Sequence, residues 1–177
     1  PPPPPPPPPP FFFLKPHDGT LAPLWSRGLG DVYKRQVDVA YYDIERIRKI
    51  ITQTVKKILK AGTFPVVIGG DHSVNIPCIN AFDGQEPFHL VQIDAHLDFV
   101  DERHGVRYGH GNPMRRAAEK AYVTGLSQIG IRNVSSTARN GYEDARAMGS
   151  DIVSVRQFRK MGVEAMLTRI PRGARYY

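Results

Sequence analysis

The sequence Gln-Ile-Asp-Ala-His-Leu-Asp, at residues 92–98, decides the predicted fold, because an apolar stretch passes there into polar side chains. Residues 89–93 are predicted as a strand, and Asp94, His96 and Asp98 follow at alternate positions. On an extended backbone, alternate side chains point to one side of the chain. Carboxylates and imidazoles bind manganese, iron, cobalt, nickel or zinc. We therefore predict a metal site, although a plain loop after a strand would also be polar.

A second polar segment, Gly-Gly-Asp-His-Ser at residues 69–73, follows another predicted strand at residues 64–68. That strand is apolar and β-branched, which is typical of a strand covered on both faces. The two glycines permit a sharp turn, and open α/β sheets bind ligands beyond the carboxyl ends of their strands. We predict His72 as a further metal ligand. Asp71 or Ser73 has the alternative role of capping a helix that begins near residue 74.

Predicted strands and helices alternate along the remaining chain with short connections. An amphipathic helix is predicted over residues 43–59, closed by Gly62. Further helices are predicted at residues 114–122, 142–148 and 163–169, and further strands at residues 126–131 and 152–155. This order predicts an α/β fold with a mostly parallel sheet covered on both faces.

Composition limits the classes of protein to consider. The length of 177 residues suits one domain, and 41% hydrophobic residues are enough for a core. A single cysteine, Cys78, excludes an internal disulfide framework and favours a reducing compartment, so we predict a cytoplasmic protein. No apolar run approaches the roughly 20 residues that span a bilayer. The N-terminus lacks a signal-peptide pattern, and we expect no membrane association.

The net charge of +7 raises the question of nucleic-acid binding. Residues 1–36 carry +2, and Arg169, Arg172 and Arg175 add +3, so the two ends hold five of the seven charges. The remaining chain lacks a basic face interleaved with exposed aromatic residues. We therefore predict no nucleic-acid partner.

The first 36 residues open with ten prolines and three phenylalanines and show no sustained periodicity. A polyproline helix could dock on an SH3-type groove. The pattern is more typical of translated linker or out-of-frame sequence. We predict a disordered, Pro-rich leader at residues 1–36 and exclude it from the fold, leaving a partial domain at residues 37–177.

The two polar motifs together resemble those of the ureohydrolase family, which includes arginase and agmatinase. The resemblance runs from about Val37 to the C-terminus, and residues 108–116 are similar to the agmatinase-like branch. It implies an arginase-like three-layer αβα sandwich, truncated at both ends, and two Mn²⁺ ions per complete subunit. By resemblance, His72 and Asp98 bind one ion, His96 binds the other and Asp94 bridges both. The family also implies a homo-oligomer, a trimer or a hexamer.

The implied reaction is hydrolysis of a small guanidino substrate, with agmatine ranked first, guanidinobutyrate second and arginine third. Asp98 would hydrogen-bond the nucleophile. His110, just before a helix that Pro113 can open, resembles the histidine that passes protons to the leaving amine; a structural histidine is the alternative. Residues in the intervening loop are candidate substrate contacts, or else a solvated charged loop: Asp101 and Glu102 for an ammonium tail, and Arg107 for a carboxylate.

The sequence departs from the family at its end. Tyr176 and Tyr177 are predicted to begin another strand, and the family's third metal motif, Asp-x-Asp-x-x-Asp-Pro, is not in the sequence. Nor is the later Glu that binds the guanidinium. We therefore expect an internal fragment of a longer enzyme, inactive alone, with one weak metal site at most. A non-catalytic fragment or an interaction module that uses its proline tail is the alternative.

Overall fold

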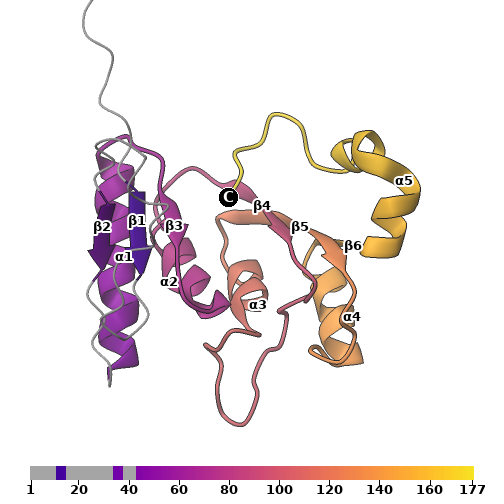
Figure 1. Ribbon diagram of the computed structural model, residues 1–177, viewed down its shortest axis with the longest axis horizontal. Coiled ribbons are helices and arrows are strands. Elements are labelled where there is room, and N and C mark those ends of the chain that lie inside the picture. The colour runs from indigo at the N-terminus through magenta and orange to yellow at the C-terminus, as the bar shows by residue number, and fades with distance from the viewer. Residues whose placement is uncertain (1–10, 15–33, 38–42) are drawn as a thin grey trace, which may run out of the picture. The chain divides into compact units, whose positions relative to one another are not determined.

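The computed structural model describes residues 11–14, 34–37 and 43–177, and the strands in this part form two three-stranded sheets (Figure 1). The chain divides into two compact units, residues 1–81 and residues 82–177. All strand pairs within the two sheets are parallel, as the alternation of strands and helices predicts.

The first unit contains a sheet of order β2-β1-β3, formed by β1 (Phe11–Leu14), β2 (Lys34–Val37) and β3 (Val66–Ile68). Two of these strands lie wholly or mostly in the segment that we excluded from the fold. Phe-Phe-Phe-Leu has strong β-propensity, which the proline run beside it obscured. The remainder of the predicted leader lies outside the described residues, so its disorder stays a prediction. β3 is less covered than predicted, since Ile68 is exposed.

Helix α1 (Ile44–Lys60) confirms the predicted amphipathic helix almost residue for residue. Asp43 caps it by accepting a hydrogen bond from the Arg46 N–H at 2.9 Å. Gly62, with φ of 70°, follows its end. Its buried side chains recur at helical spacing: Ile51, Val55 and Ile58.

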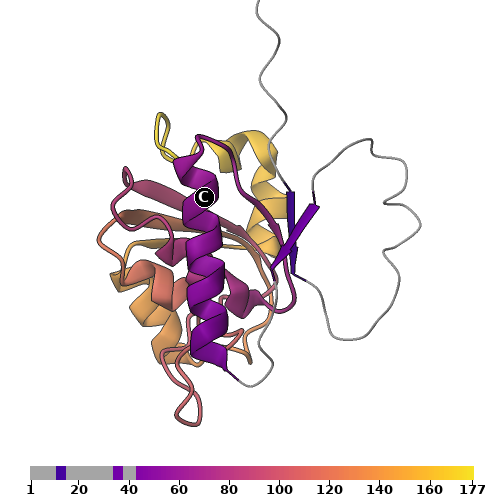
Figure 2. The same cartoon turned by 90° about the vertical axis from the view of Figure 1, so that its left-hand side faces the viewer.

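The second unit consists of three layers. Its parallel sheet has the order β4-β5-β6, formed by β4 (Phe88–Ile93), β5 (Val123–Ile131) and β6 (Ser150–Ser154). Helices α3 (Pro113–Ala118) and α4 (Arg139–Ala147) cover one face, and α5 (Val155–Leu167) covers the other (Figures 1 and 2). This is the predicted αβα layering.

Helix α5 starts eight residues earlier than the predicted helix at residues 163–169. Ser154 and Gln157 form a capping box at its start, and Gly162, with φ of 79°, introduces a kink inside it. The kink interrupts the apolar periodicity, which is why only the second half was predicted. The helix packs on a core of buried residues that come from the sheet and from the helix itself: Ile129, Val153 and Met166.

The last residues pair with the free edge of β4. The His89 N–H donates to the Arg175 carbonyl at 2.7 Å, and the Tyr177 N–H donates to the His89 carbonyl at 3.0 Å. The bridge between His89 and Tyr176 is parallel, as expected for the start of another strand. None of the described helices combines the length and the apolar character needed to cross a bilayer.

Candidate metal centre

The predicted metal-binding turn begins where β4 ends at Ile93. The Asp94 carboxylate accepts a hydrogen bond from the His96 N–H at 2.8 Å, and the same Oδ1 lies 3.3 Å from His96 Nδ1. The extended backbone considered for residues 94–98 is therefore wrong, because this local bond bends the chain. On a strand, side chains two residues apart would be separated by about 6.6 Å. The bend brings a carboxylate and an imidazole into contact instead.

Asp98 occupies an unusual position for a carboxylate. It is 7% exposed and lies between Leu97 and Phe99, which are completely buried. Its φ of 50° places a non-glycine residue in the left-handed region, and its carbonyl accepts a hydrogen bond from the Met114 N–H at 3.1 Å. Such backbone conformations cost free energy and are concentrated at functional sites. The turn therefore fixes the Asp98 backbone in a conformation that a plain polar loop would not need.

The backbone at the end of β5 anchors the turn. The Asp94 N–H donates to the Ile129 carbonyl at 3.0 Å. The Ala95 carbonyl accepts from the N–H groups of Arg132 and Asn133, at 2.9 and 3.0 Å. These bonds place the turn at the carboxyl edge of the parallel sheet, where α/β proteins bind ligands.

Two buried glutamines add side-chain support that the sequence reasoning missed. Gln128 Nε2 donates to the Leu97 carbonyl at 2.7 Å and to Gln92 Oε1 at 2.6 Å. Gln92 Nε2 in turn donates to the His96 carbonyl at 3.3 Å. The available signal was a glutamine inside each of two mostly apolar strands, since buried polar side chains need partners.

Gly130 lets β5 approach the turn closely. Its φ is 92°, and a Cβ at this position would lie 3.2 Å from the Asp94 carbonyl oxygen. A glycine inside a strand pattern indicates such a close approach. Any larger residue would therefore press directly on the backbone of a predicted metal ligand.

His72 belongs to the first unit. It begins the 3₁₀ helix η2 (His72–Val74), which leads into α2 (Asn75–Asn80). Asp71 caps η2 by accepting a hydrogen bond from the Ser73 N–H at 2.8 Å, and it also contacts the Ser73 hydroxyl. Asp71 is thus a cap, but of η2 and not of the helix predicted to begin near residue 74, because α2 has Val74 at its N-cap position and no side-chain cap bond. The ligand role of His72 stays a prediction.

The candidate substrate residues lie in the loop after the turn. Asp101 accepts hydrogen bonds from Arg107, at 2.9 Å, and from the buried Arg116 of α3. The hydrogen bond from Arg116, helped by the charge of Arg107, holds the pKa of the Asp101 carboxyl below its ordinary value. Asp101 and Arg107 therefore compensate each other's charge. Glu102 and His110 are exposed, and their roles stay predictions.

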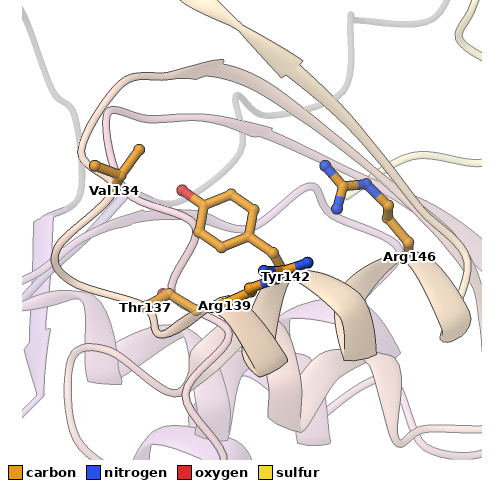
Figure 3. A pocket seen from close by; sticks show the side chains of 5 residues that line it. All are labelled: Val134, Thr137, Arg139, Tyr142 and Arg146. Atoms are coloured by element: carbon orange, nitrogen blue, oxygen red, sulfur yellow. The ribbon is translucent and has the colours of Figure 1, made fainter.

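A hollow of about 300 Å³ lies beside the start of α4. Figure 3 shows the Tyr142 ring between Val134 and Arg146, with Thr137 and Arg139 below it. The Tyr142 hydroxyl donates to the Asn133 carbonyl at 3.3 Å, and burial raises its pKa against the opposing charge of Arg146. None of the predicted site residues lines this hollow.

Comparison with known proteins gives the same assignment as the two motifs. The sequence model of the arginase family matches residues 25–176. The chain belongs to the arginase family. The match begins at Trp25, within the segment predicted as a leader.

Arginase-family relatives are similar along most of this chain. Over 81% of this chain, the sequence is 34% identical to guanidinopropionase of Pseudomonas aeruginosa. Over 75% of this chain, it is 30% identical to arginase 2 of Arabidopsis thaliana. These matches cover 44% and 38% of the relatives. The crystal structure of agmatine ureohydrolase of Thermoplasma volcanium aligns with a TM-score of 0.69 at 25% identity, covering 82% of this chain and 48% of that one. The fold is therefore arginase-like, and the chain spans less than half of these relatives.

Proposed function

We propose that the complete protein is a manganese-dependent hydrolase that releases urea from a small guanidino substrate. The anchored turn at residues 94–98 is the observation that carries this proposal. It holds two carboxylates and an imidazole at the carboxyl edge of a parallel sheet. Membership of the arginase family supports the same reaction class.

The donor set fits manganese. Carboxylate oxygens and imidazole nitrogens suit hard and borderline divalent ions. Asp94, His96 and Asp98 would hold the metal together with His72 from the first unit. When bound there, Mn²⁺ would supply Lewis acidity and would lower the pKa of a water molecule towards neutral pH. The hydrogen bonds of Gln128, Gln92 and the β5 backbone hold the turn that carries these ligands.

Two residues of the chain have further proposed roles in the reaction. The Asp98 carboxylate accepts a hydrogen bond from the attacking water and orients it. His110 donates a proton to the departing amine, which is a poor leaving group unless it is protonated. The exposed position of His110 in its loop leaves the imidazole accessible to substrate.

Agmatine remains the first substrate that we propose, with release of putrescine and urea. The structure supplies a reason for a second candidate, a guanidino acid such as guanidinobutyrate. Asp101 was expected to attract the ammonium tail of agmatine, but its charge is compensated by Arg107 and Arg116. Similarity to guanidinopropionase supports the same alternative. Arginine is the third candidate, and a homo-oligomer, trimer or hexamer, is the proposed assembly.

Urea release by the full-length protein with Mn²⁺ tests the proposal. Agmatine, guanidinobutyrate and arginine would be compared, with putrescine measured for the first. Replacing His96 by Asn should lower kcat by about three orders of magnitude, because metal catalysis contributes several kcal/mol and each 1.36 kcal/mol is tenfold in rate. His104→Asn, in the exposed loop, is the matched control and should retain activity. Unchanged turnover in His96→Asn would refute the assignment of this turn.

A further inference from the structure

Asn112 is a buried amide between the loop that carries His110 and helix α3. It is 3% exposed. Its Oδ1 accepts a hydrogen bond from the Gly109 N–H at 2.8 Å. Its Nδ2 donates to the Val100 carbonyl at 2.7 Å and to the Asp101 carbonyl at 3.3 Å. One side chain thus links the two ends of the loop at residues 100–111, with Val100 and Asp101 at one end and Gly109 at the other.

The backbone closes the same loop beside Asn112. The Val100 N–H donates to the Gly111 carbonyl at 3.0 Å, and the Asn112 N–H donates to the Gly109 carbonyl at 3.2 Å. Farther out, the paired backbone groups of Arg103 and Val106 form a turn. The base of the loop is therefore held by partly buried hydrogen bonds, although most of its residues are exposed.

The chemistry at the base of the loop requires an amide. The side chain must accept one hydrogen bond and donate others at the same time, and among short side chains only asparagine offers both an oxygen acceptor and an NH₂ donor pair. Gly109 fits the same arrangement, since a Cβ there would lie 3.3 Å from Asn112 Oδ1. The glycine thus allows the N–H to approach the amide oxygen closely.

We infer that Asn112 is a positioning residue for His110, which lies two residues before it in the chain. The inference rests on the proposed function. By joining Gly109 to Val100 and Asp101, the amide fixes the backbone on the N-terminal side of His110 relative to the segment that follows Asp98. The imidazole is thereby held in one place relative to the candidate metal-binding turn, without contact between Asn112 and the substrate.

Asn112→Asp is the informative substitution, because a carboxylate still accepts from Gly109 but cannot donate to Val100 or Asp101. Its matched control is Asn140→Asp, the same chemical change at an exposed asparagine of α4. In the full-length protein with Mn²⁺, we expect kcat for Asn112→Asp to fall about 10- to 100-fold, as large as the effect of removing a hydrogen bond that orients a metal ligand. KM should change less than about threefold and Asn140→Asp should match the wild type.

Amide hydrogen exchange gives a readout that does not depend on turnover. In Asn112→Asp, exchange should accelerate in the loop at residues 100–111, while the β5 amides keep their protection. A second variant, Gly109→Ala, crowds the amide oxygen without removing it, so it guards against a folding failure of the first. It should show a smaller fall in kcat, again with little change in KM.

The outcomes distinguish a failure of the proposed function from a failure of the role inferred for Asn112. A wild-type protein that hydrolyses none of the guanidino compounds would overturn the proposed function and the inference with it. An active wild type whose Asn112→Asp and Gly109→Ala variants keep kcat would overturn only the inference. A loop that exchanges faster while kcat stays unchanged would also overturn it, since Asn112 would then stabilise the loop without positioning His110.

Discussion

The two candidate ligand segments use the same local turn in different settings. Asp71 accepts a hydrogen bond from the Ser73 N–H, and Asp94 accepts one from the His96 N–H, both at 2.8 Å. In each case an aspartate after a strand bonds to the backbone two residues on. Each turn also includes a predicted histidine ligand, His72 in one and His96 in the other.

The support around the two turns differs. The turn at residues 94–98 is held by the end of β5 and by the buried amides of Gln92 and Gln128. The side-chain hydrogen bonds of Asp71 at residues 71–73 are local, and Asp71 is exposed. The same aspartate-to-backbone hydrogen bond therefore does not imply that the two turns are equally rigid. We expect the turn at residues 94–98 to be the more rigid of the two.

Among substitutions that test the difference between the two turns, Gln128→Met is expected to have the largest effect on stability and on metal affinity. The substitution keeps the volume but leaves the Leu97 carbonyl and Gln92 Oε1 without their donor. An unpaired buried acceptor costs about 1–3 kcal/mol, so the free energy of unfolding should fall by about 2–4 kcal/mol. Mn²⁺ affinity should also fall about 10- to 100-fold. Urea denaturation and calorimetric titration of the full-length protein measure the two quantities.

Ser127→Ala is the matched control for Gln128→Met. Ser127 is equally buried on β5, but its hydroxyl lies 2.9 Å from His89 Nε2, so it supports the opposite face of the sheet. The variant should lose about 1 kcal/mol of stability and keep its Mn²⁺ affinity. If both variants weakened metal binding alike, general destabilisation would explain the result and the special role of Gln128 would be wrong.

An intermediate effect is expected from Gly130→Ala. An alanine held at a backbone φ of 92° costs about 1–2 kcal/mol of folding free energy. The new Cβ would also lie only 3.2 Å from the Asp94 carbonyl oxygen. Gly149→Ala isolates the first cost, because φ there is 88° and no atom lies within 4 Å of the added Cβ. Only Gly130→Ala should weaken Mn²⁺ binding in titrations, and equal binding by both variants would contradict the proposed close contact.

The first turn supplies the counterpart of that test. At Gly70 an added Cβ would meet no atom within 4 Å. Gly70→Ala should therefore change the free energy of unfolding by no more than about 0.5 kcal/mol. A large loss of stability or of metal affinity at Gly70 would show that this turn is as tightly held as the second.

Part of the fold could be predicted from the sequence alone. Helix α1 was predictable because its apolar spacing, its Asp43 cap and Gly62 all agree. Strands β3 to β6 were predictable from apolar runs that alternate with helices. The bend at residues 94–98 was not, because the bond from Asp94 to His96 competes locally with an extended chain, and periodicity does not register such bonds.

Long-range partners were the other source of error. The contact between Gln92 and Gln128 joins residues 36 positions apart, so it exists only once β4 and β5 pair. The sequence places a polar residue in each strand but cannot match them. Likewise, the composition of the first residues concealed β1, whose pairing with β2 and β3 depends on distant segments.

The smallest effect concerns pH and the strand that carries the second turn. His89 of β4 is 6% exposed, and burial lowers its pKa below the ordinary value, although the charge of Asp151 opposes this shift. Between that lowered pKa and about 6.5, the unfolded chain binds more protons than the folded one. The free energy of unfolding should therefore fall as the pH drops from 7.5 to 5.

His89→Gln tests this contribution, because glutamine can still hydrogen-bond to Ser127 but cannot take up a proton in this pH range. Urea midpoints at pH 7.5 and pH 5 should differ less in the variant than in the wild type. The other five histidines are common to both proteins, so the comparison removes their effect. An identical pH dependence would mean that His89 is protonated as readily in the sheet as in the unfolded chain.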